Sequence, residues 1–150
     1  METNGMDDVC FLMTANIGEA LKPMSKVASG GELARIMLAI KNVLAEQDRV
    51  GTLIFDEVDA GVSGRAAQKV AEKLRAVSKG KQVLCVTHLP QIAAAANNHL
   101  LIAKSERNGR TYTQVTSLDK EGRKREIARI IGGAEITPIT LQSAEEMLVE

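Results

Sequence analysis

Apolar residues recur every three or four positions along several segments of the chain. This period places them on one side of a helix, so it predicts amphipathic helices. The expected helices cover residues 30–46, 65–78, 120–131 and 138–148, and helix-forming residues also follow Pro90.

Other segments are short and apolar throughout, which predicts strands buried on both faces, as in the middle of a parallel sheet. These segments are residues 9–13, 52–55 and 82–87. Residues 100–103 and 111–115 predict a hairpin instead, because Asn108 and Gly109 between them favour a tight turn.

Polar residues follow two of the expected strands at the point where each strand ends. Asp56 and Glu57 follow residues 52–55, and His88 follows residues 82–87. Ligands of open α/β sheets bind at this edge, so we expect Asp56 to hold Mg²⁺ and Glu57 to orient or deprotonate a water. The alternatives are an acidic surface turn and a structural histidine.

The first long helix begins with a Ser-Gly-Gly-Glu sequence. Ser29 and Glu32 have the spacing of a capping box. Gly30 and Gly31 each cost about 1 kcal/mol of helix stability relative to Ala, so another cause should explain them. One hypothesis is close approach of an anion such as phosphate to the helix start, and the other is a capping box beside a flexible loop. Ser63 is the expected N-cap of the next helix.

Composition describes one ordinary globular domain over residues 1–150, with 45% hydrophobic and 25% charged residues. Lys+Arg and Asp+Glu both number 19, so no net field attracts nucleic acid, and 2% aromatic residues exclude a base-stacking surface.

The polar start is no signal peptide and no apolar run could span a membrane. Cys10 and Cys85 lie in apolar runs, which suggests small buried core residues in a reducing compartment, and we expect a cytoplasmic protein without membrane contact.

Basic residues are locally in excess near the hairpin and the helix that follows it. A solvated amphipathic face is the favoured interpretation over a nucleic-acid patch, because acids and isoleucines are interspersed. The basic residues are Lys104, Arg107, Arg110, Lys120, Arg123, Lys124, Arg125 and Arg129.

Three motifs now stand in a fixed order: Ser-Gly-Gly-Glu at a helix start, an apolar strand that ends in Asp56-Glu57, and a later strand that ends before His88. Together they resemble the carboxyl-terminal lobe of an ABC-type ATPase head, a P-loop NTPase. They would be its signature motif (residues 29–32), Walker B motif (residues 53–57) and switch histidine (His88). The wording KVASGGELARIMLAIK, IFDEVDAGVSG and VTHLPQIAA is similar to the RecN family of bacterial DNA repair proteins, relatives of the SMC proteins. Ala28 and Ser63 depart from the general ABC pattern and agree with the RecN-like form.

The resemblance implies an α/β fold with a largely parallel sheet flanked by helices, a β-hairpin and terminal helices. It implies ATP and Mg²⁺ as cofactors, with Glu57 and His88 as catalytic residues. The loop after Walker B would bind nucleotide through Asp59, Ala60, Gly61 and Ser63. We expect Ser29, Gly30, Gly31 and Glu32 to lie outside this site, on a different helix start, and to reach the γ-phosphate held by a second head of a head-to-tail homodimer.

No G-x-x-x-x-G-K-[ST] phosphate loop occurs in the sequence. In the family that loop lies in an amino-terminal lobe beyond a coiled coil. We therefore expect half of a nucleotide site, inactive alone, from a protein that hydrolyses ATP and binds DNA in double-strand break repair and recombination at the nucleoid. The alternatives are a lobe of another SMC-like or ABC ATPase, including a transporter subunit, and a truncated segment that only binds partner heads.

Overall fold

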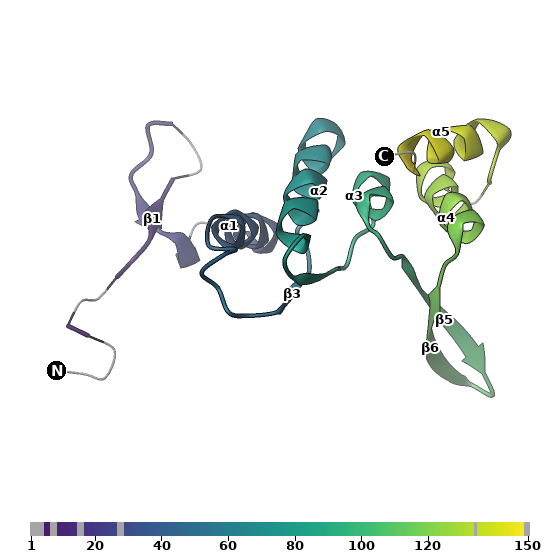
Figure 1. Cartoon of the computed structure of the whole chain (residues 1–150), viewed down its shortest axis with the longest axis horizontal. Helices are drawn as coiled ribbons and strands as arrows, with labels where there is room; N and C mark the ends of the chain where they lie inside the picture. The colour runs from purple at the N-terminus through teal and green to yellow at the C-terminus, as the bar shows by residue number, and fades with distance from the viewer. Residues whose placement is uncertain (1–4, 7–8, 15–16, 27–28, 134, 149–150) are drawn as a thin grey trace.

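The computed structural model describes residues 5–6, 9–14, 17–26, 29–133 and 135–148. Helices and small sheets follow one another along the long axis of the molecule, and the β5–β6 hairpin projects from it (Figure 1). The helices are η1 (Met24–Lys26), α1 (Gly30–Val43), α2 (Gly64–Ser78), α3 (Pro90–Ala95), α4 (Lys120–Gly132) and α5 (Pro138–Leu148). The strands are β1 (Leu12–Met13), β2 (Lys22–Pro23), β3 (Thr52–Phe55), β4 (Gln82–Cys85), β5 (Leu100–Arg107) and β6 (Arg110–Ser117).

The helix predictions are confirmed, with small shifts at the ends. The first long helix stops at Val43, three residues before the expected end at residue 46. The strand expected over residues 9–13 is shorter: β1 covers Leu12–Met13 and pairs with β2 in antiparallel order. Ala28, which differs from the general ABC pattern, lies outside the described residues.

The expected parallel sheet consists, within the described residues, of β3 and β4. They pair in parallel from Thr52 opposite Gln82 to Phe55 opposite Cys85. Our expectation that both strands are buried on both faces is wrong. Leu53 and Phe55 are buried, but Ile54 between them is 71% exposed, and Leu84 and Val86 are also exposed. Helices cover one face of this sheet, and no described segment covers the other.

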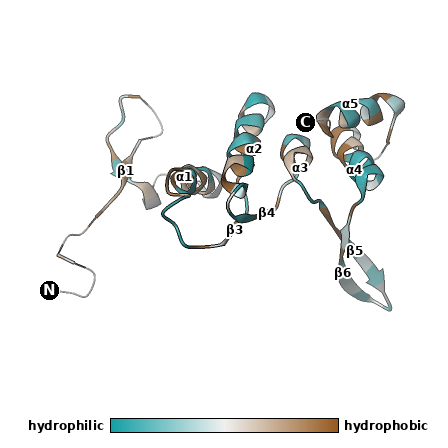
Figure 2. Cartoon of the chain, in the orientation of Figure 1, coloured by the Kyte–Doolittle hydropathy of each residue, from teal (hydrophilic) through white to brown (hydrophobic). Residues whose placement is uncertain are grey.

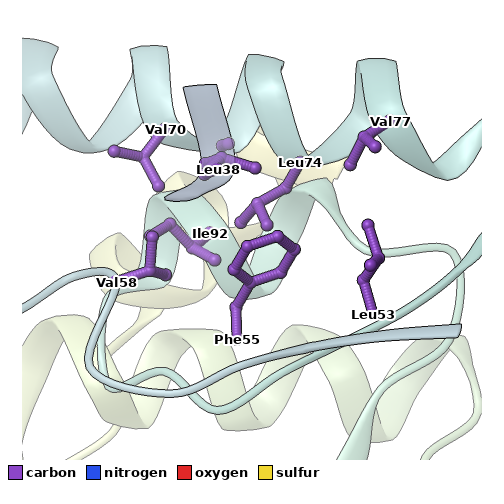
Figure 3. Packing of buried hydrophobic residues seen from close by; sticks show 9 residues of the cluster. Leu38, Leu53, Phe55, Val58, Val70, Leu74, Val77 and Ile92 are labelled. Carbon is purple, nitrogen blue, oxygen red and sulfur yellow. The ribbon is translucent and has the colours of Figure 1, made fainter. Parts of the chain in front are cut away.

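The main core lies between the covered face of β3–β4 and the helices α1, α2 and α3. Phe55 and Leu53 point from the strand toward Leu74 and Val77 of α2, and Val58 and Ile92 close one side (Figure 3). All five residues of the expected apolar face of α2 are buried: Ala67, Val70, Ala71, Leu74 and Val77. Burial of this amphipathic face holds α2 on the sheet.

A second core lies between α3, α4 and α5. Ile127, Ala128 and Ala144 are fully buried there, beside Ala93 of α3. Hydrophobic and hydrophilic residues share the ribbons of α4 and α5, as expected of helices with one buried side (Figure 2). The helix α3 contributes Ile92 to the main core and Ala93 to the second one, so it joins the two.

Several basic residues near this second core serve intramolecular contacts. The Arg123 guanidinium donates to the backbone carbonyls of Ala94, Ala96 and Asn97 at the end of α3. Lys124 pairs with Glu145 at 2.6 Å, and Arg129 pairs with Glu126 at 2.7 Å. These contacts agree with the amphipathic-face interpretation of the basic excess.

The hairpin prediction is confirmed. The strands β5 and β6 pair in antiparallel order from Leu100 opposite Ser117 to Arg107 opposite Arg110. Asn108 and Gly109 have φ angles of 52° and 70°, the left-handed pair that a type I′ turn requires.

Candidate functional site

The carboxylates of Asp56 and Glu57 lie at the carboxyl end of β3, as predicted, and both residues are exposed. The Asp56 Oδ1 atom accepts a hydrogen bond of 2.9 Å from the Glu57 backbone N–H. Glu57 has a φ angle of 58°, in the left-handed region that residues other than glycine rarely adopt. Strained backbone of this kind gathers at functional sites, so it adds weight to Glu57 as a functional residue.

The capping box at the start of α1 is confirmed. The Ser29 Oγ atom accepts from the Glu32 backbone N–H at 3.4 Å, and the Glu32 carboxylate accepts from the Ser29 backbone N–H at 2.8 Å. The Ser29 hydroxyl also donates to Glu32 Oε2 at 3.0 Å. The hydrogen bonds from Ser29 lower the pKa of Glu32, so this carboxylate stays ionised at the helix start.

The two glycines of the motif face the turn that follows β3 in the same chain. A Cβ atom on Gly31 would lie 2.8 Å from the Ala60 carbonyl oxygen and 3.0 Å from the Glu57 carbonyl oxygen. A Cβ atom on Gly30 would collide with the Glu57 carboxylate. Close packing against backbone therefore requires glycine at position 31, whereas at Gly30 the nearby atoms belong to the end of a flexible side chain. Neither sequence-based hypothesis included this cause.

This packing also brings the Ser-Gly-Gly-Glu motif close to the acids of the same chain, although they lie on different elements. The start of α1 rests directly on the turn formed by residues 57–60, so the motif and Glu57 are neighbours within one chain. Arg35 of α1 strengthens the contact, because its Nη1 atom donates to the carbonyls of Ala60 at 2.7 Å and Val58 at 3.3 Å. Sequence reasoning missed Arg35, since its backbone acceptors leave no mark in the residue pattern.

Asp59 joins the loop after β3 to the loop after β4. It is 3% exposed, although we expected it in a nucleotide-binding loop. Its Oδ2 atom accepts from Thr87 Oγ1 at 2.6 Å and from the His88 backbone N–H at 2.9 Å, and His88 Nδ1 lies 3.1 Å away. Burial alone would raise the pKa of Asp59, but the hydrogen bonds from Thr87 and His88 outweigh it and lower the pKa.

The rest of this loop is more open. Ala60 is half-buried, and Gly61 is exposed with a φ angle of 73°. Ser63 occupies the N-cap position of α2 in an extended conformation, as predicted, but its side chain makes no capping hydrogen bond. The N-cap position of Ser63 is therefore confirmed, although its hydroxyl does not take part in capping.

A shallow cleft of about 390 Å³ lies between α1 and β3, next to these motifs. Its lining is mainly apolar and includes Leu33 and Met37 from the helix and Ile54 from the strand. Gly30 and Asp56 complete the lining, so the cleft opens beside the acidic end of β3.

We expected a metal ion at Asp56. In the part of the chain that the structure describes, no three His, Cys, Asp or Glu side chains lie close enough to hold one. None of the helices described is both long and apolar enough to pass through a membrane.

The sequence is similar to DNA repair proteins named RecN. It is 56% identical to RecN of Bacillus subtilis over 144 residues, which are 96% of this chain and 25% of that protein. It is 54% identical to RecN of Halalkalibacterium halodurans and 48% identical to RecN of Vibrio cholerae, each over 97% of this chain and 26% of the relative. The chain thus spans about a quarter of the length of these relatives, and no protein-family model matches it.

The fold is similar to solved heads of SMC proteins. A Smc head domain with coiled coil and joint from Pyrococcus yayanosii matches with a TM-score of 0.55 and 26% identity, over 73% of this chain and 20% of that one. A structure from work on ATP-driven dimerization and DNA-stimulated activation of SMC ATPases matches with a TM-score of 0.52 and 25% identity, over 79% of this chain and 70% of that one. In sequence and in fold, the chain therefore corresponds to the carboxyl-terminal part of RecN and to a lobe of an SMC-type ATPase head.

Proposed function

We propose that the complete protein is an ATPase of DNA double-strand break repair and recombination at the bacterial nucleoid, and that this chain supplies the hydrolytic half of its head. The convergence of three elements carries the proposal. The end of β3, the end of β4 and the start of α1 meet through the contacts of Gly30 and Gly31 with residues 57–60 and of Asp59 with His88. Similarity to RecN supports the role in DNA repair.

Asp56 suits Mg²⁺ held through its water shell. Mg²⁺ keeps several waters and takes one or two carboxylates together with substrate phosphates, so a single exposed carboxylate is a sufficient protein contribution. One Asp56 oxygen accepts from the Glu57 N–H, which fixes the direction of the carboxylate. The ion would neutralise charge on the transferred phosphoryl group.

Glu57 would align the attacking water and accept its proton, because it is exposed and projects from a turn that α1 and Arg35 hold in place. His88 would contact the γ-phosphate from the neighbouring strand end. Ser29 to Glu32 and residues 60–63 would contact nucleotide held by a second head, so that ATP joins two heads and its hydrolysis separates them. Since α1 rests on residues 57–60, a nucleotide docked on α1 would also brace the turn that carries Glu57.

An amino-terminal lobe of the same head would supply the phosphate loop. The uncovered face of β3–β4 supports this partner, because parallel sheets are normally covered on both faces. Ile54, Leu84 and Val86 form an apolar surface of the kind that another layer buries. The lengths of the RecN relatives leave about three quarters of such a protein to provide it.

Substitution of Glu57 in the complete protein tests this function. Glu57→Gln keeps the shape of the side chain and removes the base, so ATP hydrolysis should fall by roughly 10²- to 10⁴-fold. ATP should still bind, and head dimers should accumulate with it. Phosphate release and ATP-dependent dimer formation by light scattering are the measurements.

The matched control is Glu46→Gln, which changes another exposed glutamate, in the turn after α1. It should leave both readouts unchanged. Equal hydrolysis by the Glu57→Gln variant and the wild type would remove Glu57 from the reaction.

A further inference from the structure

We propose that Asp59 is a positioning residue for His88. Its buried carboxylate would fix the imidazole ring and keep a proton on Nδ1, so that Nε2 becomes the nitrogen that meets a ligand. The proposed ATPase function gives this arrangement its purpose, but the proton position on His88 is a property of the chain itself.

The contacts of one oxygen atom, Asp59 Oδ2, support a proton on His88 Nδ1. Asp59 Oδ2 accepts hydrogen bonds from the Thr87 hydroxyl at 2.6 Å and from the His88 backbone N–H at 2.9 Å, and the His88 Nδ1 atom lies 3.1 Å from the same oxygen. An ionised carboxylate only accepts hydrogen bonds, so the ring contact is attractive only when Nδ1 carries the proton. Backbone and ring of His88 are therefore held by the same atom.

The charge of the buried Asp59 carboxylate gives a second reason. A carboxylate as buried as Asp59 is costly unless a positive or hydrogen-bonding partner compensates it. Across the described ranges, His88 is the one basic side chain that pairs with Asp59. Arg35 passes close by, but its guanidinium donates to the carbonyls of Val58 and Ala60 on either side. The Thr87 hydroxyl and the His88 backbone N–H compensate the buried carboxylate by hydrogen bonds, and a proton on His88 Nδ1 would add a third compensating contact.

The consequence concerns the free side of the ring. The His88 side chain is 74% exposed, so most of the imidazole is open to a ligand. In the neutral ring the proton on Nδ1 makes Nε2 an acceptor, and a contact with a phosphate oxygen requires a second proton on Nε2. Asp59 would hold the ring in the orientation that directs Nε2 toward the ligand, as carboxylates that orient catalytic histidines do.

A purely structural role for Asp59 would only hold the loop after β4. Thr87→Val isolates that role, because the Thr87 hydroxyl donates to Asp59 and accepts from the Leu89 N–H without touching the imidazole. Asp59→Ala removes both the loop contacts and the ring contact. Asp59→Asn keeps the shape and an acceptor but removes the charge.

The primary test is ¹⁵N NMR of the histidine side chains in this chain, at a pH where the imidazoles are neutral. His88 and His99 are its two histidines, and His99 serves as the internal reference. We expect His88 with its proton on Nδ1 in the wild type and in Thr87→Val, and a shift of the proton toward Nε2 in Asp59→Ala. A wild-type His88 that carries its proton on Nε2 overturns the proposal, whether or not the variants fold.

The second arm measures ATP hydrolysis by the complete protein. We expect Asp59→Asn to lower kcat by roughly 10- to 100-fold, the usual cost of losing a residue that orients a functional side chain, with KM unchanged. Thr87→Val should stay close to wild type. Equal kcat for Asp59→Asn and wild type contradicts the proposal. Failure of the proposed function would appear in the Glu57→Gln test and leave the proton position on His88 as predicted.

Discussion

At the scale of single residues, Gly31 shows how a motif that resembles a ligand site also obeys internal packing. The residue is buried, and the atoms around its missing side chain belong to the turn after β3. Its neighbour Gly30 faces the Glu57 carboxylate, which is the end of a flexible side chain. Gly31 therefore allows α1 to pack closely against the turn of residues 57–60.

Gly31→Ala should lower the free energy of unfolding. An added Cβ atom would lie 2.8 Å from the Ala60 carbonyl oxygen, and overpacking of this kind costs about 1 to 3 kcal/mol, partly offset by the better helix propensity of Ala. Urea denaturation measures the change. Gly51→Ala is the control, because no atom lies within 4 Å of its Cβ position. An equal free energy of unfolding for the two variants would contradict the prediction, because it would mean that residues 57–60 move to accommodate the added Cβ atom without loss of stability.

Cys85 and Cys10 should differ in reactivity. Burial, together with the negative charges of Asp59 and Asp56, raises the pKa of the Cys85 thiol to about 11. Only about one such thiol in a thousand is ionised at pH 8, and the thiolate is the reactive form. Cys10 is exposed. A time course of iodoacetamide modification followed by mass spectrometry should show Cys10 modified first, with the difference lost in urea. Equal rates in the folded chain would contradict the prediction.

At the scale of elements, the two long helices that flank β3 begin differently. Ser29 caps α1 with its side chain, whereas Ser63 stands at the same position of α2 without a capping hydrogen bond. Both serines looked alike in the sequence. Whether a side chain completes a cap depends on local rotamers and neighbours, which spacing alone does not specify.

Alanine substitutions should separate the two helix starts. Ser29→Ala removes a used cap and should cost about 1 kcal/mol of stability, whereas Ser63→Ala should cost only a few tenths. Thermal melting of both variants beside the wild type is the measurement. A larger loss for Ser63→Ala than for Ser29→Ala would mean that the assigned caps are wrong.

Element positions were predictable because each has a local cause. Helical periodicity located α1, α2, α4 and α5, and the turn residues located the β5–β6 hairpin. The burial of β3 was not predictable from its own residues. Ile54 is as apolar as its neighbours, yet it is exposed because covering it needs a layer that the described residues do not contain.

At the scale of the whole molecule, the candidate site joins residues that are distant in the chain. Asp56, Glu57 and His88 were predictable candidates because they follow strands that share a sheet edge. The contacts that order them were not predictable, because they depend on tertiary geometry. Arg35 reaches the turn after β3 from α1, and Asp59 reaches His88 across the two strands.

The described residues form two small cores joined by α3 and leave one face of β3–β4 uncovered. The chain spans about a quarter of the length of the RecN relatives. We propose that this chain supplies the hydrolytic residues while another segment of the complete protein supplies the phosphate loop. The chain alone should therefore bind Mg·ATP weakly, because backbone N–H groups of the phosphate loop provide much of the contact to the phosphates.

The most direct measurement is phosphate release from Mg·ATP by this chain, by the remainder of the complete protein, and by a mixture of the two. We expect hydrolysis only in the mixture, and a loss of roughly 10²- to 10⁴-fold when the chain carries Glu57→Gln. Hydrolysis by the chain alone, binding of Mg·ATP to it tighter than about 1 μM, or an undiminished mixture with Glu57→Gln would contradict the account.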